Sequence, residues 1–100
     1  MTTPPSPAYQ PAAPRHASPR DEAEQARLEE ARAVHRRLSG EVTILENFDR
    51  RLTRQIHEKQ EQGQSRDDYV RELIQRRISV RARLEEMRAR RNRAGQVAGL

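Results

Sequence analysis

The sequence contains no cysteine and no tryptophan, and only 3% of its 100 residues are aromatic. The absence of cysteine excludes disulfides, zinc–thiolate sites and thiol catalysis. Hydrophobic residues make up 33% of the chain and charged residues 35%. This composition offers too little apolar material for a globular core of ordinary thickness, and it fits long, solvated helices.

Long apolar runs are also missing. No segment approaches the roughly 20 apolar residues that a membrane-spanning helix requires. The first residues contain no apolar region of the kind that marks a secretory signal. We therefore expect a soluble, intracellular protein without a membrane span, and the sequence does not distinguish nucleus from cytoplasm.

Proline is concentrated at one end of the chain. Residues 1–17 hold five of the six prolines, together with small and polar residues that provide almost nothing to bury. Such a segment cannot offset the entropy lost on ordering, so residues 1–17 are predicted to form a disordered, Pro-rich tail.

A long helix is predicted to follow the tail, over about residues 19–62. Ser18 is a suitable N-cap and Pro19 suits the first helical position. No later proline forces this helix to end before Gly63. Gly40 is its weak point, because a mid-helix glycine costs about 1 kcal/mol relative to alanine. A kink there, or a break into three helices, is the alternative.

The turn is predicted around Gly63, which would supply a left-handed C-cap to the first helix. Ser65 with Asp68 three residues later resembles a capping motif that opens a second helix. We expect this second helix over about residues 66–93, followed by a frayed C-terminus at 95–100.

Both predicted helices carry a stripe of coiled-coil periodicity. The stripe positions are Leu28, Ala31, His35, Leu38, Val42, Leu45, Asp49, Leu52, Ile56 and Lys59 in the first helix, and Val70, Leu73, Arg77, Val80, Leu84, Met87 and Arg91 in the second. When the chain folds back at Gly63, seven layers of these positions face one another. The sequence therefore predicts an all-α fold, a long antiparallel helical hairpin of the coiled-coil type over residues 18–94.

Two charged residues interrupt the stripes. Asp49 and Arg77 stand where apolar residues are expected, and the antiparallel register places them in the same layer. We predict that they form a register-setting pair, since fixing register is the best-attested use of a buried ion pair. The alternative is that both side chains point outward from a poorly defined stripe.

Several large apolar residues remain outside the predicted seam. Ile44 and Phe48 lie on one flank with Tyr69 nearby, whereas Ile74 and Ile78 lie on the opposite flank. A two-helix hairpin cannot cover both flanks. These five residues are the predicted protein-interaction sites, and they suggest that a bundle is completed by homo-oligomerisation or by another coiled-coil subunit.

Arginine supplies all but one of the 20 basic residues, and the net charge is +5. The predicted register gathers seven arginines at the open end of the hairpin: Arg32, Arg36, Arg37, Arg88, Arg90, Arg91 and Arg93. This cluster would suit phosphate groups of a nucleic acid or an acidic protein partner. A GC-rich genome would also produce many arginines, and no aromatic residue near the cluster indicates base recognition.

No catalytic constellation is visible. His16, His35 and His57 are far apart in the sequence, and acidic residues alternate with arginines at helical spacings, as on solvated helix faces. We expect a non-enzymatic coiled-coil subunit or adaptor that mediates protein–protein assembly, with no cofactor, metal or small-molecule ligand. The alternative function is an Arg-rich, nucleic-acid-associated protein of low sequence specificity.

Overall fold

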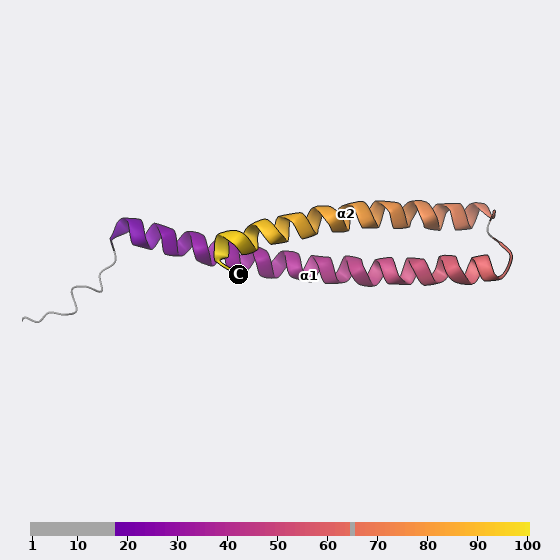
Figure 1. Ribbon diagram of the computed structural model, residues 1–100, viewed down its shortest axis with the longest axis horizontal. Coiled ribbons are helices and arrows are strands. Elements are labelled where there is room, and N and C mark those ends of the chain that lie inside the picture. Colours follow the sequence, from indigo (N-terminus) through magenta and orange to yellow (C-terminus); the bar gives the residue numbers. More distant parts are fainter. Residues whose placement is uncertain (1–17, 65) are drawn as a thin grey trace, which may run out of the picture.

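The computed structural model describes residues 18–64 and 66–100, so the predicted tail at residues 1–17 lies outside the described residues. Two long helices, α1 (Pro19–Glu61) and α2 (Asp68–Ala98), run antiparallel and pack along their lengths (Figure 1). The prediction of an all-α helical hairpin is confirmed.

Helix α1 begins where the sequence indicated. The Ser18 hydroxyl accepts a hydrogen bond from the backbone N–H of Asp21 at 3.2 Å, which satisfies one of the free donors at the helix start. The helix then continues through Gly40 without interruption. The alternative of a break into three helices is therefore wrong, since the residues on both sides of Gly40 have helical partners and only a small propensity cost opposes them.

The turn is closed by a glycine in the left-handed region, Gly63, with φ of 76°. Its N–H donates to the carbonyl of Gln60 at 3.0 Å, and the N–H of Gln64 donates to the carbonyl of Lys59 at 3.0 Å. These two bonds form a Schellman motif, which satisfies carbonyls that the end of α1 would otherwise leave free. The predicted role of Gly63 as a C-cap is confirmed.

Helix α2 starts at Asp68, two residues later than expected. Its N-cap is Asp67, whose carboxylate accepts a hydrogen bond from the backbone N–H of Tyr69 at 3.0 Å. An aspartate directly before the helix provides the acceptor that the sequence interpretation assigned to Ser65, a residue outside the described part of the chain.

The other end of α2 differs more from the prediction. The helix does not end near residue 93 but continues to Ala98. Gly99 adopts φ of 76° and its N–H donates to the carbonyl of Gln96 at 3.2 Å, while the N–H of Leu100 donates to the carbonyl of Gly95 at 2.8 Å. This second Schellman motif caps the segment that was expected to fray.

The core of the hairpin consists of two apolar clusters along the seam. The cluster nearer the open end contains Leu38, Val42, Leu84 and Met87, and the cluster nearer the turn contains Leu52, Ile56 and Leu73. All seven residues occupy predicted seam positions, and each cluster mixes the two helices as the antiparallel register requires. Between the clusters the seam contains half-buried, charged positions.

The first turns of α1 extend beyond the end of α2 (Figure 1), and residues 18–27 are all exposed. The overhang ends near Ala31, which is buried because the last turns of α2 reach it. The two helices approach closely where Gly95 of α2 faces His35 of α1. A Cβ at Gly95 would lie 3.2 Å from Cδ2 of His35, so glycine makes room for the imidazole ring.

Candidate protein-interaction surface

One flank of the hairpin, which we call the ion-pair flank, is closed by charged contacts between the helices. Arg81 donates to the carboxylate of Asp49 at 2.9 Å, and Arg88 donates to Glu46 at 2.8 Å. These are the only cross-helix ion pairs among residues 18–64 and 66–100. Because their side chains are all partly exposed, each pair contributes about 1 kcal/mol or less to stability.

The structure thus pairs Asp49 with Arg81 rather than with Arg77, the predicted partner. Asp49 stands at the edge of the seam with its side chain 20% exposed, and Arg81 reaches it from the flank of α2, one turn beyond Arg77. A long arginine on the flank keeps its guanidinium in water while it contacts the carboxylate, which avoids the desolvation that a pair inside the seam would require. Arg77 is half-buried and forms no ion pair with the residues that the structure describes.

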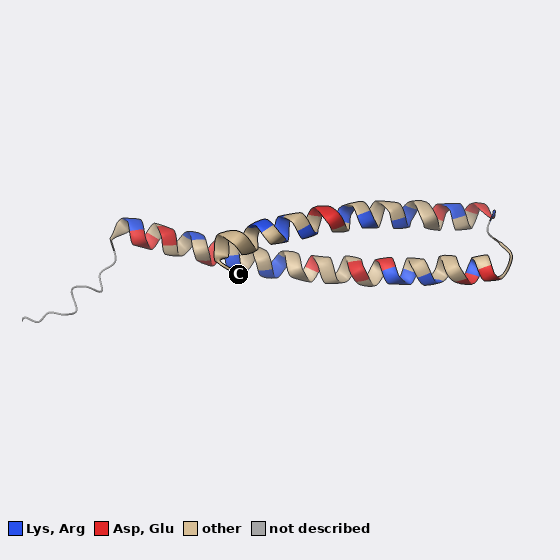
Figure 2. Cartoon of the chain, in the orientation of Figure 1, with Lys and Arg blue, Asp and Glu red and all other residues tan. Residues whose placement is uncertain are grey.

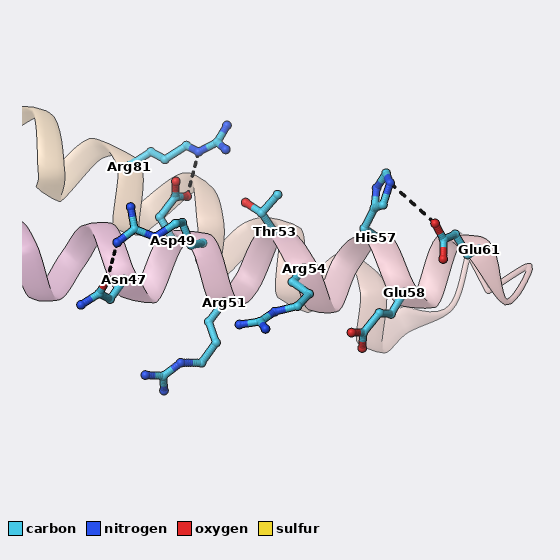
Figure 3. Close-up of a pocket in the computed structure, with 10 residues that line it drawn as sticks. Asn47, Asp49, Arg51, Thr53, Arg54, His57, Glu58, Glu61 and Arg81 are labelled. Atoms are coloured by element: carbon cyan, nitrogen blue, oxygen red, sulfur yellow. Dashed lines mark hydrogen bonds and ion pairs between the residues drawn. The ribbon is translucent and has the colours of Figure 1, made fainter.

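A shallow polar groove follows the ion-pair flank towards the turn (Figure 3). Asp49 and Arg81 point towards each other at one end, and His57 points towards Glu61 at the other, with 3.8 Å between Nε2 and a carboxylate oxygen. The His57 and Glu61 side chains are both largely exposed. Thr53 lies between them, and its Oγ1 is buried without a hydrogen-bond partner. Nowhere in the described ranges do His, Asp or Glu side chains gather as a metal site would require.

The opposite flank, which we call the apolar flank, presents large hydrophobic side chains to solvent. Its exposed members are Ile44, Phe48, Tyr69 and Val97, and beside them the half-buried Val34 and Val80 pack against the two core clusters. Val34 and Phe48 are two heptads apart on α1, and Tyr69 and Val97 are four heptads apart on α2, so in each helix they return to the same side.

Four of these residues are substantially exposed to solvent. The exposed fractions are 66% for Ile44, 46% for Phe48, 46% for Tyr69 and 55% for Val97. Phe48 and Val80 line one shallow groove between the helices, and Val34 and Val97 line another nearer the open end. The apolar flank therefore combines exposed hydrophobic side chains with shallow grooves beside them.

Ile74 and Ile78, which were both predicted to remain outside the seam as interaction sites, differ in how far they are exposed. Ile74 is half-buried and packs against the cluster of Leu52, Ile56 and Leu73. Ile78 is 54% exposed on the ion-pair flank, next to the cross-helix contacts. The two flanks are thus unequal. Val97, which sequence reasoning placed in a frayed end, joins the apolar flank because α2 is longer than predicted.

The predicted arginine cluster lies around the open end, along the last third of α2 and the adjoining part of α1 (Figure 2). Arg32 and Arg91 are half-buried, whereas Arg36, Arg37 and Arg93 are exposed. Arg88 is engaged by Glu46, and Arg90 is engaged by Glu86 at 2.7 Å. Part of the positive charge is therefore already neutralised within the hairpin.

Over the described residues, neither helix has a stretch that is both long and apolar enough to cross a membrane. The chain matches no protein-family model, and no curated protein or solved structure is significantly similar to it.

Proposed function

We propose that this chain is a non-enzymatic coiled-coil subunit or adaptor that mediates protein–protein assembly by completing a helical bundle. The observation that supports the proposal most directly is the apolar flank, where four large hydrophobic side chains are 46–66% exposed. Large exposed apolar side chains that share one side of a protein mark candidate interaction sites. The lack of cysteine and the wide separation of the histidines in sequence also support a role without catalysis.

The geometry of the apolar flank suits a helical partner. Two antiparallel helices leave grooves between them, and an amphipathic helix fills such a groove with residues spaced by three, four and seven. Phe48 and Val80 offer apolar walls for such residues, while charged side chains around them would provide the polar rim.

The proposal is tested by affinity capture from the native source with three baits: the wild-type chain, Phe48→Glu and Ile78→Glu. Phe48 and Ile78 are 46% and 54% exposed on opposite flanks, so both glutamates can be solvated in the isolated hairpin. We expect Phe48→Glu to lose proteins that wild type and Ile78→Glu retain. Identical captured sets for all three baits would contradict the proposal.

A second candidate function is low-specificity binding to a nucleic acid phosphate backbone. The observation in its favour is the group of exposed arginines at the open end, Arg36, Arg37 and Arg93. Binding of this kind weakens steeply with salt. Titration of a generic duplex at two salt concentrations, with Arg36→Gln/Arg37→Gln as the variant, separates the candidates. Nuclease treatment of the captured samples provides the same distinction.

A further inference from the structure

We propose that the partner on the apolar flank is a second copy of this chain, related by a twofold axis that passes between Ile44 and Phe48. In this dimer each α1 runs antiparallel to α1 of the second copy, and the two hairpins form a four-helix bundle. The inference rests on the proposed function, because both use the apolar flank. It adds the identity of the partner and its register.

The first support is the spacing of apolar residues about position 46, midway between Ile44 and Phe48. Val34 precedes this position by 12 residues, about 18 Å along the helix. Tyr69 lies beside Lys59, with 5.6 Å from the ammonium nitrogen to the ring centroid, and Lys59 follows position 46 by 13 residues, about 20 Å. The stretch of the flank from Val34 to Tyr69 thus has a centre and two nearly equidistant ends, with Val97 farther out towards the open end.

A twofold axis at position 46 places each end of the flank in one copy against the opposite end of the flank in the other copy. Ile44 of each copy falls on Phe48 of the other, and the Val34 end of each copy falls near the Tyr69 end of the other. An isologous contact requires a self-complementary surface of this kind. Ile44 with Phe48, and the Val34 end with the Tyr69 end, then form the apolar contacts, whereas Val97 lies outside the matched stretch.

The second support is charge complementarity at the same centre. Glu41 and Arg51 lie five residues on either side of position 46, so the axis brings Glu41 of each copy to Arg51 of the other. Both residues are exposed, and neither forms an ion pair with the residues that the structure describes. Figure 3 shows the Arg51 side chain pointing away from Asp49 of α1 and from Arg81 of α2.

The remaining charged residues on the flank of α2 do not oppose this arrangement. The core layers place position 46 of α1 level with about position 80 of α2, so the axis would bring Arg76 of each copy near Arg83 of the other, but each has a glutamate on its own helix. Arg76 lies 3.6 Å from Glu72, and Arg83 lies 3.5 Å from Glu86. These intrahelical pairs reduce the repulsion that two bare arginines would cause.

The other twofold arrangement, with the axis parallel to the helices, fits less well. It would stack α1 on α2 of the second copy at the same level. Phe48 would then meet the level of Arg76 and Ser79, the residues that line its own groove. Apolar side chains would face charged ones, whereas the antiparallel stacking places apolar on apolar.

Sedimentation equilibrium of the full chain tests the dimer. We expect wild type to be dimeric at 100 μM and Phe48→Glu to raise the dissociation constant at least about a hundredfold, because the twofold axis counts each substitution twice. Ile78→Glu, on the ion-pair flank, should leave the constant within about threefold of wild type. Circular dichroism confirms that each variant remains helical. A monomeric wild type, or equal effects of both variants, would overturn the inference.

Charge reversal tests the register. Glu41→Arg and Arg51→Glu should each raise the dissociation constant about threefold to tenfold, and the chain that carries both changes should return towards wild type. A double variant weaker than either single one would refute the pairing.

The absence of cysteine permits a direct geometric test. Glu41→Cys and Arg51→Cys chains are mixed in equal amounts and oxidised under mild conditions. We expect the mixed 41–51 disulfide to exceed both symmetric products. Dominant 41–41 or 51–51 products would exclude the proposed axis.

The two proposals fail separately. A wild-type monomer at 100 μM would overturn self-association through this flank. The assembly function would survive that result if Phe48→Glu still lost a captured partner that Ile78→Glu retained, because another protein would then occupy the apolar flank.

Discussion

Replacement of Gly40 by alanine should stabilise the hairpin. Gly40 lies in the middle of α1, is exposed, and has no heavy atom within 4 Å of the position that a Cβ would occupy. Its φ is not positive, so alanine adopts the same backbone without strain. The substitution removes the conformational freedom of glycine from the unfolded chain and leaves the folded packing unchanged.

The expected gain is about 1 kcal/mol, the difference between glycine and alanine inside a helix. For a folded region of this size, such a gain raises the melting temperature by about 4–8 °C. Thermal unfolding followed by circular dichroism at 222 nm measures it. Chain concentration is held fixed, because self-association would also raise the melting temperature.

Gly63→Ala is the matched control. Gly63 also has open space around its Cβ position, but its φ of 76° lies in the left-handed region. Alanine there should cost about 1 kcal/mol, so the two substitutions should shift the melting temperature in opposite directions. A lower or unchanged melting temperature for Gly40→Ala would mean that α1 is not a continuous helix at this position.

Three further predictions concern stability. A double-mutant cycle between Asp49 and Arg81, using alanine, should give a coupling energy below about 1 kcal/mol, and a cycle between Asp49 and Arg77 should give zero within error; a larger second coupling would restore the pairing expected from sequence. Thr53→Val should raise the unfolding free energy by about 1 kcal/mol in urea titration, because it removes a buried hydroxyl that lacks a partner, and a loss would mean that Oγ1 is hydrogen-bonded in solution. Deletion of residues 1–17 should leave the melting temperature unchanged, since this segment has no helical apolar pattern, and a clear decrease would show that it packs on the hairpin.

The sequence was sufficient to predict the fold because its signals agree with one another. Ser18 before Pro19 marked the start of α1, and a lone glycine at position 63 between two stripes marked the turn. The stripes also predicted the register of the core, since Leu38 with Met87 and Val42 with Leu84 share one cluster. Periodicity determines which backbone positions face the partner helix, and that information is fully contained in the spacing of residues.

Side-chain reach was harder to predict. Heptad positions place Asp49 opposite Arg77, but they do not say that an arginine one turn away can contact the same carboxylate from a more solvated position. The same limitation concealed the difference between the flanks. Ile74 and Ile78 are four residues apart on α2, yet only Ile74 packs against the core.

The C-terminal end of α2 was mispredicted for a different reason. Two glycines in the last six residues suggested fraying, because glycine has a low helix propensity. In the folded hairpin these glycines have specific uses. Gly95 makes room for His35 on α1, and Gly99 provides the left-handed residue of the Schellman motif. The first use depends on a residue 60 positions away, which no local pattern reveals.

The division of the core into two clusters also sets an order in which the hairpin can close. Leu52 and Leu73 in the turn-side cluster are 21 residues apart, whereas Leu38 and Met87 in the open-end cluster are 49 apart. Closing the longer loop first costs roughly 0.75 kcal/mol more in chain entropy. Once the turn-side cluster has formed, however, the second closes over a much shorter length of free chain. We therefore expect the hairpin to fold as a zipper from Gly63 outward, and its amide protons to exchange soonest beyond the half-buried polar layer at Asp49, towards the open end.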